Sequence, residues 1–167
     1  VLLQLIDNMK HYPSASNARP LQVTIVRSKE KVKLLNDLTE EALIRMFSFL
    51  CKPWVSPFIR IFAPSINVNK IKRYRDSFIS RSETNDSQIC HHAPAVVLFH
   101  GEVSKTGMTE ADANIWATYT SIYANTLGLG TCFNGFIVKA MGKKSKLNPK
   151  FKVPVNHQVF AALLVGY

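Results

Sequence analysis

Two parts of the first fifty residues carry apolar side chains at helical spacing. Between residues 2 and 11 this spacing predicts the last turns of a helix, which Pro13 ends. The β-branched run 22–26 predicts a short strand. Ser28 is a suitable N-cap, and the pattern after it predicts a helix over about 29–50. The expected buried face of that helix consists of Val32, Leu35, Leu38, Ala42, Met46 and Phe49.

The second half of the chain alternates apolar strands with a helix that carries little charge. Continuous apolar runs predict a buried central strand at 95–99 and a last strand at 158–165. Between them, Thr109 and Asp112 resemble a capping box that opens a helix, and Gly128 is placed to end it in the left-handed conformation. Its opposite face is polar but uncharged, which predicts a helix covered on both sides, at a domain centre or a subunit interface. The expected apolar face consists of Ile115, Trp116, Tyr119, Ile122, Tyr123 and Leu127.

The remaining segments are shorter. Three prolines punctuate 53–64 and predict short helices there, and a basic amphipathic helix or turn is predicted over 69–78. A short helix near 136–142 precedes a lysine-rich loop. No repeat or domain boundary is visible, so residues 1–167 are predicted to form a single α+β domain. Because Val1 runs directly into a helical pattern, we expect the natural chain to begin further upstream.

Composition is typical of a globular protein of a reducing compartment. The 167 residues are 47% hydrophobic, which is enough for one sizeable core. Three cysteines do not suit a disulfide-stapled secreted scaffold, and this favours the cytoplasm. No signal peptide is visible, and the uncharged stretch 113–138 contains too many polar residues and glycines to cross a bilayer. We therefore expect no membrane partner.

Positive charge is unevenly distributed. The formal net charge is +10, no Asp or Glu follows Asp112, and there are basic clusters at Lys70–Arg75 and Lys139–Lys152. The simplest explanation of such clusters is that they are solvent-exposed faces with no specific function. The functional explanation is attraction of an anion, which could be a phosphate-bearing cofactor, a dinucleotide, an acidic redox partner or nucleic acid. Net charge does not choose among these.

Conventional catalytic motifs are missing from the sequence. It contains no Walker loop, no GxGxxG, GxSxG or HExxH motif and no clustered cysteines. Cys90, His91 and His92 would point to opposite faces if they lay along a strand, so we expect no metal site there. Cys132 is predicted to be a buried structural thiol rather than a nucleophile. No side chain is therefore assigned a catalytic role.

Two polar loops of small residues remain as candidates for chemistry. Residues 13–20 (PSASNARP) and 128–135 (GLGTCFNG) both offer backbone N–H groups together with small polar side chains. Such groups can hydrogen-bond the rim of a planar heterocycle. Each loop also has a purely structural explanation, the first as a helix-to-strand turn and the second as a helix C-cap.

Taken together and in this order, the motifs resemble the nitroreductase family of FMN-dependent oxidoreductases. PSASNARP (13–20) is followed by HAPAVVLF (92–99), by a long helix running into GLGTC (111–136) and by a final VFAALLVGY (159–167). The resemblance covers nearly the whole chain. The motif sequences are most similar to those of family members that are fused to ferredoxin-type modules or work beside them. A ferredoxin-type redox partner is therefore among the implied partners.

The resemblance implies a three-layer α/β/α sandwich with a mixed, mainly antiparallel central sheet, assembled as an interlocked homodimer with FMN at the interface. It also implies a ping-pong reaction. NADH or NADPH delivers hydride to flavin N5, and a small-molecule electron acceptor such as a nitroaromatic or a quinone is then reduced at the same place. The flavin carries this chemistry, and the protein positions and tunes it.

Site residues are implied by matching this sequence to the family motif. The first loop would lie along the isoalloxazine and ribityl groups, and the second near N5, largely through backbone groups. Arg19 stands where the family usually has Gln and would favour the anionic reduced flavin. The implied flavin contacts are Pro13, Ser14, Ala15, Asn17, Arg19, Phe133, Asn134 and Gly135.

The family's basic phosphate-binding residues precede the first helix and follow the VGY ending, so we expect the natural chain to be longer at both ends. Two alternatives stay open. One is a non-catalytic binding or scaffold protein of the same fold that has lost FMN. The other is a nucleic-acid-binding domain that uses the two basic clusters, although the sequence shows no recognition helix or stacking platform.

Overall fold

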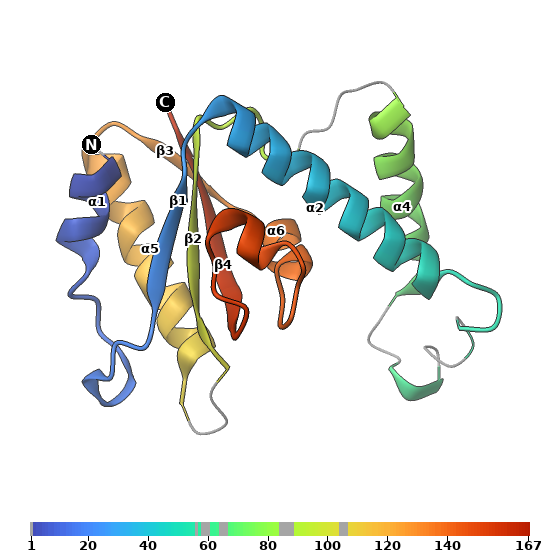
Figure 1. Cartoon of the computed structure of the whole chain (residues 1–167), viewed down its shortest axis with the longest axis horizontal. Helices are drawn as coiled ribbons and strands as arrows, with labels where there is room; N and C mark the ends of the chain where they lie inside the picture. Colours follow the sequence, from blue (N-terminus) through green and yellow to red (C-terminus); the bar gives the residue numbers. More distant parts are fainter. Residues whose placement is uncertain (1, 56, 58–60, 64–66, 84–88, 104–106) are drawn as a thin grey trace.

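A four-stranded antiparallel sheet forms the centre of the molecule (Figure 1). The computed structural model describes residues 2–55, 57, 61–63, 67–83, 89–103 and 107–167. The strand order is β1-β2-β4-β3. All three strand pairings in this part of the chain are antiparallel, and the parallel member of the expected mixed sheet is not among them. The strands are β1 (Gln22–Val26), β2 (Ala95–Glu102), β3 (Gly130–Phe133) and β4 (His157–Gly166).

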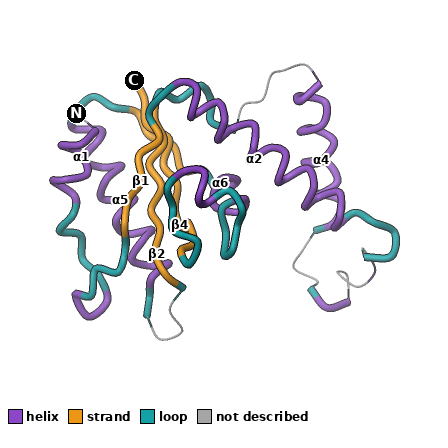
Figure 2. The backbone as a smooth tube through the Cα atoms, viewed as in Figure 1, coloured by secondary structure: helices purple, strands orange, loops and turns teal. Residues whose placement is uncertain are grey.

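Helices cover both faces of the sheet, which confirms the three-layer α/β/α sandwich (Figure 2). On one face lie α1 (Leu2–Met9) and α5 (Thr109–Thr126). On the other lie α2 (Lys29–Leu50) and α6 (Gly135–Ala140), with α4 (Val68–Glu83) packed on α2.

The two strands at the centre of the sheet divide the core into two apolar clusters. In β2, Val97 and Phe99 join the cluster beneath α1 and α5, whereas Val96 and Leu98 join the cluster beneath α2 and α6. This alternation follows from the two-residue period of a strand. The predicted continuous apolar run is therefore buried because both of its faces are covered.

Helix α2 begins and ends where the sequence predicts, but the face that it buries is rotated about the helix axis relative to the predicted face. The Ser28 hydroxyl accepts a hydrogen bond from the Lys31 N–H at 3.1 Å, as a good N-cap does. Asn36 is buried because its side-chain oxygen accepts from the Cys90 N–H at 3.0 Å, a contact across 54 residues. Phe49, expected in the core, is half exposed. Of the segment 53–64, where short helices are predicted, positions 56, 58–60 and 64 lie outside the described residues.

The predicted start and apolar face of α5 are partly wrong. Met108 occupies the N-cap, and no side chain caps the helix, so the capping box does not form. The face against the sheet is built mainly from small residues together with Trp116, because a helix with small side chains can approach the strands closely. As a result Ile115, Tyr119 and Ile122 point outward and are exposed.

The segment after α5 also differs from its prediction. Gly128 adopts the left-handed conformation with φ 73°, as expected for a helix end. Residues 130–133 do not form a loop, however, since they pair with β4 as the edge strand β3. Cys132 is consequently exposed on this edge rather than buried, and Cys90 is the buried cysteine. None of the helices described combines the length and apolar character that crossing a bilayer requires.

Two buried histidines join β2 and β4. The Nδ1 atoms of His100 and His157 lie 2.9 Å apart, and His100 Nε2 lies 3.0 Å from the Thr24 hydroxyl. Burial, and secondly the neighbouring His157, lower the pKa of His100 from 6.5 to about 4. The native state therefore holds this imidazole neutral across the mildly acidic range.

This shift predicts a pH-dependent loss of stability. Because the pKa of His100 is lower in the folded state, the unfolded chain takes up a proton first as the pH falls through 6.5 toward 4. Between pH 7 and pH 5 the free energy of unfolding should fall by roughly 2 kcal/mol on this account. Urea unfolding of the wild type and of His100→Gln at both pH values measures it. Equal pH dependence in the two proteins would contradict the assignment.

Candidate functional site

The loop over residues 13–20 is held in one conformation by its neighbours. At its start, the ring of Tyr12 stacks on Trp116 of α5, with centroids 4.5 Å apart. Within the loop, the Ser14 carbonyl accepts from the Asn17 N–H at 3.0 Å and the Ser14 hydroxyl accepts from the Arg19 N–H at 3.0 Å. Three non-glycine residues of the loop take positive φ values: Ser16 (52°), Asn17 (53°) and Arg19 (45°). Such backbone conformations are sparsely populated and persist only where the surrounding contacts hold them.

Asp112 ties this loop to α5. Its carboxylate accepts a hydrogen bond from the Ala15 N–H at 2.9 Å, 97 residues away in the chain, and the side chain is 3% exposed. The pKa of the neighbouring Tyr12 is raised by burial and secondly by the negative charge of Asp112. A charged acceptor makes a stronger hydrogen bond than a neutral one. Asp112 is therefore the main anchor of the loop. The sequence pattern had predicted instead that Asp112 helps to cap its own helix.

Close backbone approach fixes the far end of the same loop. A side chain at Gly101 of β2 would place its Cβ 3.1 Å from the Pro20 carbonyl oxygen and 3.3 Å from both Leu21 and Thr109. A side chain here would require the loop, the strand or the start of α5 to shift by a few tenths of an ångström, so glycine allows the three to pack this closely. The loop is thus clamped at both ends before any ligand binds.

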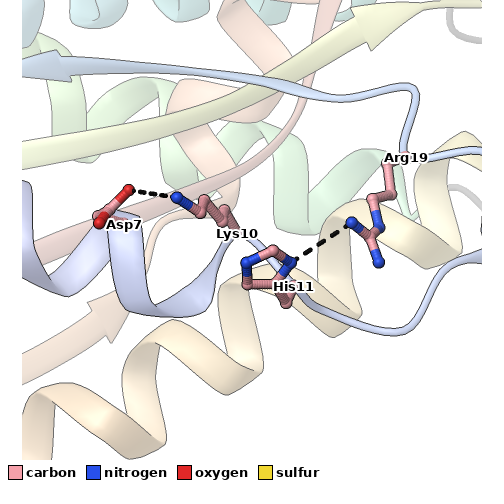
Figure 3. A network of polar contacts seen from close by, with 4 residues as sticks. All are labelled: Asp7, Lys10, His11 and Arg19. Carbon is pink, nitrogen blue, oxygen red and sulfur yellow. Dashed lines mark hydrogen bonds and ion pairs between the residues drawn. The ribbon is translucent and has the colours of Figure 1, made fainter.

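Positive charge lies beside the loop (Figure 3). The Arg19 guanidinium donates to His11 Nδ1 at 3.4 Å, and Lys10 pairs with Asp7 at 2.8 Å. The hydrogen bond from Lys10 lowers the pKa of Asp7. All four side chains are exposed. Arg19 therefore contacts the short segment that follows α1 in the same chain.

The second predicted segment presents backbone more than side chain. Asn134 is buried, and its side-chain oxygen caps α6 by accepting from the Ile137 N–H at 3.0 Å. Its side-chain nitrogen donates to the Ile89 carbonyl, and its own N–H donates to Ala162. Gly135 differs, because a Cβ there would meet no atom within 4 Å. What this segment offers to a ligand is therefore the open backbone at Gly135 and the half-exposed ring of Phe133.

One chain does not bring the two segments together. The loop over 13–20 leads into β1 at one edge of the sheet and packs on α1 and α5, whereas Asn134 follows β3 at the other edge and opens α6 on the opposite face (Figure 1). Three inter-strand spacings, about 14 Å, separate the edges. A single site that uses both segments therefore requires two chains.

One cavity lies away from both predicted segments. It has a volume of about 670 Å³ and is bordered by α2, the end of α4 and the segment 90–94. None of the residues lining it belongs to the two predicted segments. In the described part of the chain, no group of three or more His, Cys, Asp or Glu side chains could hold a metal ion.

Comparison with known proteins identifies the fold. The profile of the nitroreductase family matches residues 1–167. FMN-bound nitroreductases from Bacteroides fragilis NCTC 9343 and Desulfitobacterium hafniense DCB-2 align with 99% of this chain and with 75% and 76% of their own, at 16% and 15% identity and TM-scores of 0.69 and 0.66. An FMN-dependent nitroreductase from Clostridium difficile R20291 aligns with 99% of this chain and 78% of its own, at 18% identity and a TM-score of 0.62. A search of curated proteins gives no match.

The chain belongs to the nitroreductase family. This confirms the resemblance drawn from the sequence motifs and, with the layers described above, the expected fold. The site residues, the ferredoxin-type partner and the reductant stay predictions.

Proposed function

We propose that this protein is an FMN-dependent oxidoreductase that takes hydride from NADH or NADPH and reduces a small acceptor such as a nitroaromatic or a quinone. The observation that carries the proposal is the clamped loop over 13–20, held by Asp112 in a family whose solved members include FMN-bound proteins. When bound, FMN supplies the hydride-accepting N5 atom. The chain supplies position and charge.

The residues present suit a flavin. The exposed Asn17 carboxamide and the Ser14 hydroxyl supply hydrogen-bonding groups for the ring and ribityl oxygens. The open backbone at Gly135 leaves space for a flat ring to approach closely, next to the half-exposed Phe133. Arg19 supplies positive charge beside the first loop, which favours a reduced, anionic flavin. These groups bind and orient the ring, and none of them takes part in bond breaking.

The active form is proposed to be a homodimer. The outward side of α5 carries an apolar stripe at helical spacing formed by Ile115, Tyr119 and Ile122, and Leu3 and Met108 are also exposed. Exposed apolar patches of this kind mark association surfaces. A two-fold interface also offers a way to bring the loop over 13–20 of one chain to the Gly135 backbone of the other, and it does so twice.

Titration with FMN tests this proposal. Adding FMN to the purified protein should shift the flavin absorbance spectrum with a stoichiometry of one flavin per chain. The loaded protein should then oxidise NADH or NADPH when a quinone is supplied. A spectrum identical to free FMN would refute the proposal, whereas tight binding without turnover would favour the non-catalytic alternative.

A further inference from the structure

One peptide group, which joins Ile89 to Cys90, is held at both ends by asparagine side chains. Its carbonyl oxygen accepts a hydrogen bond from the Asn134 side-chain nitrogen, 45 residues away in the chain. Its N–H donates to the Asn36 side-chain oxygen at 3.0 Å, 54 residues away in the other direction. Because a trans peptide group is planar and its C=O and N–H point in opposite directions, the two asparagines bind it from opposite sides.

These contacts belong to a continuous chain of amide groups that runs from α6 to α2. The chain begins at the Ile137 N–H, which donates to the Asn134 side-chain oxygen at 3.0 Å. Each amide donates at one end and accepts at the other, and hydrogen bonds in such a series polarise and strengthen one another. The amide chain consists of the Ile137 N–H, the Asn134 side chain, the 89–90 peptide and the Asn36 side chain.

The amide chain is buried along its whole length. The exposed fractions are 2% for Cys90, 3% for Ile89, 6% for Asn134 and 7% for Asn36. A buried donor or acceptor that loses its partner cannot readily replace it with water. The loss of one bond in the amide chain is therefore expected to rearrange its neighbours.

Local backbone preference does not hold the 89–90 peptide in place. The next two residues, His91 and His92, take positive φ values of 46° and 55°, and the Ala93 N–H donates to the Cys90 carbonyl at 2.8 Å. Two consecutive non-glycine residues in this sparsely populated region persist only where surrounding contacts hold them. Asn36 of α2 supplies one of these contacts.

The other end of the amide chain is next to the backbone proposed to contact the flavin. Gly135, the first residue of α6, directly follows Asn134. The strand β4 fixes the Asn134 backbone, because its N–H donates to the Ala162 carbonyl at 2.9 Å. The amide chain fixes the Asn134 side chain, and through its cap the first turn of α6. The direction of the Gly135 backbone therefore depends on a side chain of α2.

We propose that Asn36 is a positioning residue for flavin binding, which acts through the 89–90 peptide and Asn134 on the Gly135 backbone. The inference rests on the proposed function and deepens it by naming a residue that belongs to neither of the two polar segments. Asn36 sets the affinity for FMN and the surroundings of the ring. It forms and breaks no bond of the cofactor or the substrate.

The variant Asn36→Leu tests the proposal, because leucine has a similar volume but no acceptor for the Cys90 N–H. FMN should bind about tenfold more weakly, as expected for the loss of one buried hydrogen bond. The absorbance maxima of the bound flavin should also shift from those of the wild-type complex. Asn36→Gln, which moves the side-chain oxygen by one methylene, is a second variant and should change both quantities in the same direction.

Two controls separate positioning from a general loss of stability. Thr39→Val replaces a fully buried hydroxyl of the same helix with a methyl group. Leu43→Ala opens a cavity in the core beneath α2 without touching the amide chain. Both controls, while folded, should keep the FMN affinity and the flavin spectrum of the wild type. An equal change in Leu43→Ala would overturn the proposal.

A double-variant cycle tests whether the effect passes through the 89–90 peptide. Asn134→Ser keeps a capping oxygen for α6 but removes the donor to the Ile89 carbonyl. Because both asparagines act on one peptide group, combining Asn134→Ser with Asn36→Leu should weaken FMN binding little more than the more damaging single variant does. Fully additive losses would show that Asn36 acts independently of Asn134 and would overturn the proposal.

Hydrogen exchange in the flavin-free protein distinguishes this proposal from the one it rests on. The Ile137 N–H should exchange about tenfold faster in Asn36→Leu than in the wild type, relative to the amides of β4, and at the wild-type rate in Thr39→Val. Faster exchange with unchanged FMN affinity and spectrum would make Asn36 purely structural, which overturns the proposal and leaves the flavin chemistry standing. Failure of the wild type to bind FMN would overturn both.

Discussion

Replacing Asp112 with alanine is expected to weaken FMN binding by roughly 10- to 100-fold. The substitution removes the carboxylate that accepts the Ala15 N–H at 2.9 Å and leaves that donor without its charged partner. Losing a hydrogen bond to a charged group costs about 1.5–3 kcal/mol, and each 1.4 kcal/mol is a factor of about ten in the dissociation constant. Because the loop must then be ordered at the moment of binding, the loss falls on FMN affinity as well as on stability. Fluorescence titration with FMN measures it.

Two further variants make this test specific. Asp112→Asn keeps an acceptor oxygen of similar shape and should recover part of the affinity. Glu110→Ala removes an exposed acid from the same first turn of α5 and should leave FMN binding unchanged. Urea unfolding of each variant shows whether it is folded under the titration conditions. If folded Asp112→Ala binds FMN as the wild type does, Asp112 does not position the loop.

A charge in the apolar stripe of α5 is expected to have a still larger effect. Ile122 is 62% exposed in the single chain, so Ile122→Glu should leave the isolated fold intact. In the proposed homodimer the same position is buried, and an unpaired carboxylate there costs several kcal/mol on each side of the interface. The variant should therefore be monomeric and bind no FMN at concentrations that saturate the wild type. Analytical ultracentrifugation and FMN titration measure the two losses.

Leu34→Glu is the matched control for this substitution. It places the same charge at an exposed apolar position of α2, on the other face of the sheet from α5. This control should stay dimeric and keep its flavin. A dimeric Ile122→Glu protein with normal FMN affinity would show that α5 does not form the interface.

Much of the secondary structure could be predicted because local signals agree with the fold. The strand over 22–26, the helix over 29–50 and the left-handed Gly128 all depend on short-range patterns or single-residue preferences. The buried faces of the helices could not be predicted in the same way. Which side of α2 or α5 meets the sheet depends on side chains from distant segments, as the Asn36–Cys90 contact shows.

The candidate site, too, could be predicted only in part from the sequence. The sequence marks the two polar segments, because their small residues and family motifs are visible in one dimension. Asp112 was visible too, but its spacing from Thr109 suggested a capping box, and the contact that uses it joins residues 97 positions apart. Nothing in the local sequence distinguishes an Asp that caps its own helix from one that accepts a hydrogen bond from a distant loop.

The sequence by itself determined that this chain is an α+β domain with two polar segments flanking an apolar core, and its motif order determined the family. Only the tertiary structure decided that β3 and α6 present the second segment on the opposite face and edge of the sheet from the first. It also decided that small residues of α5 face the strands and large ones face outward. The physical reason is that local patterns report how much a residue prefers burial, whereas the packed geometry chooses which partner provides it.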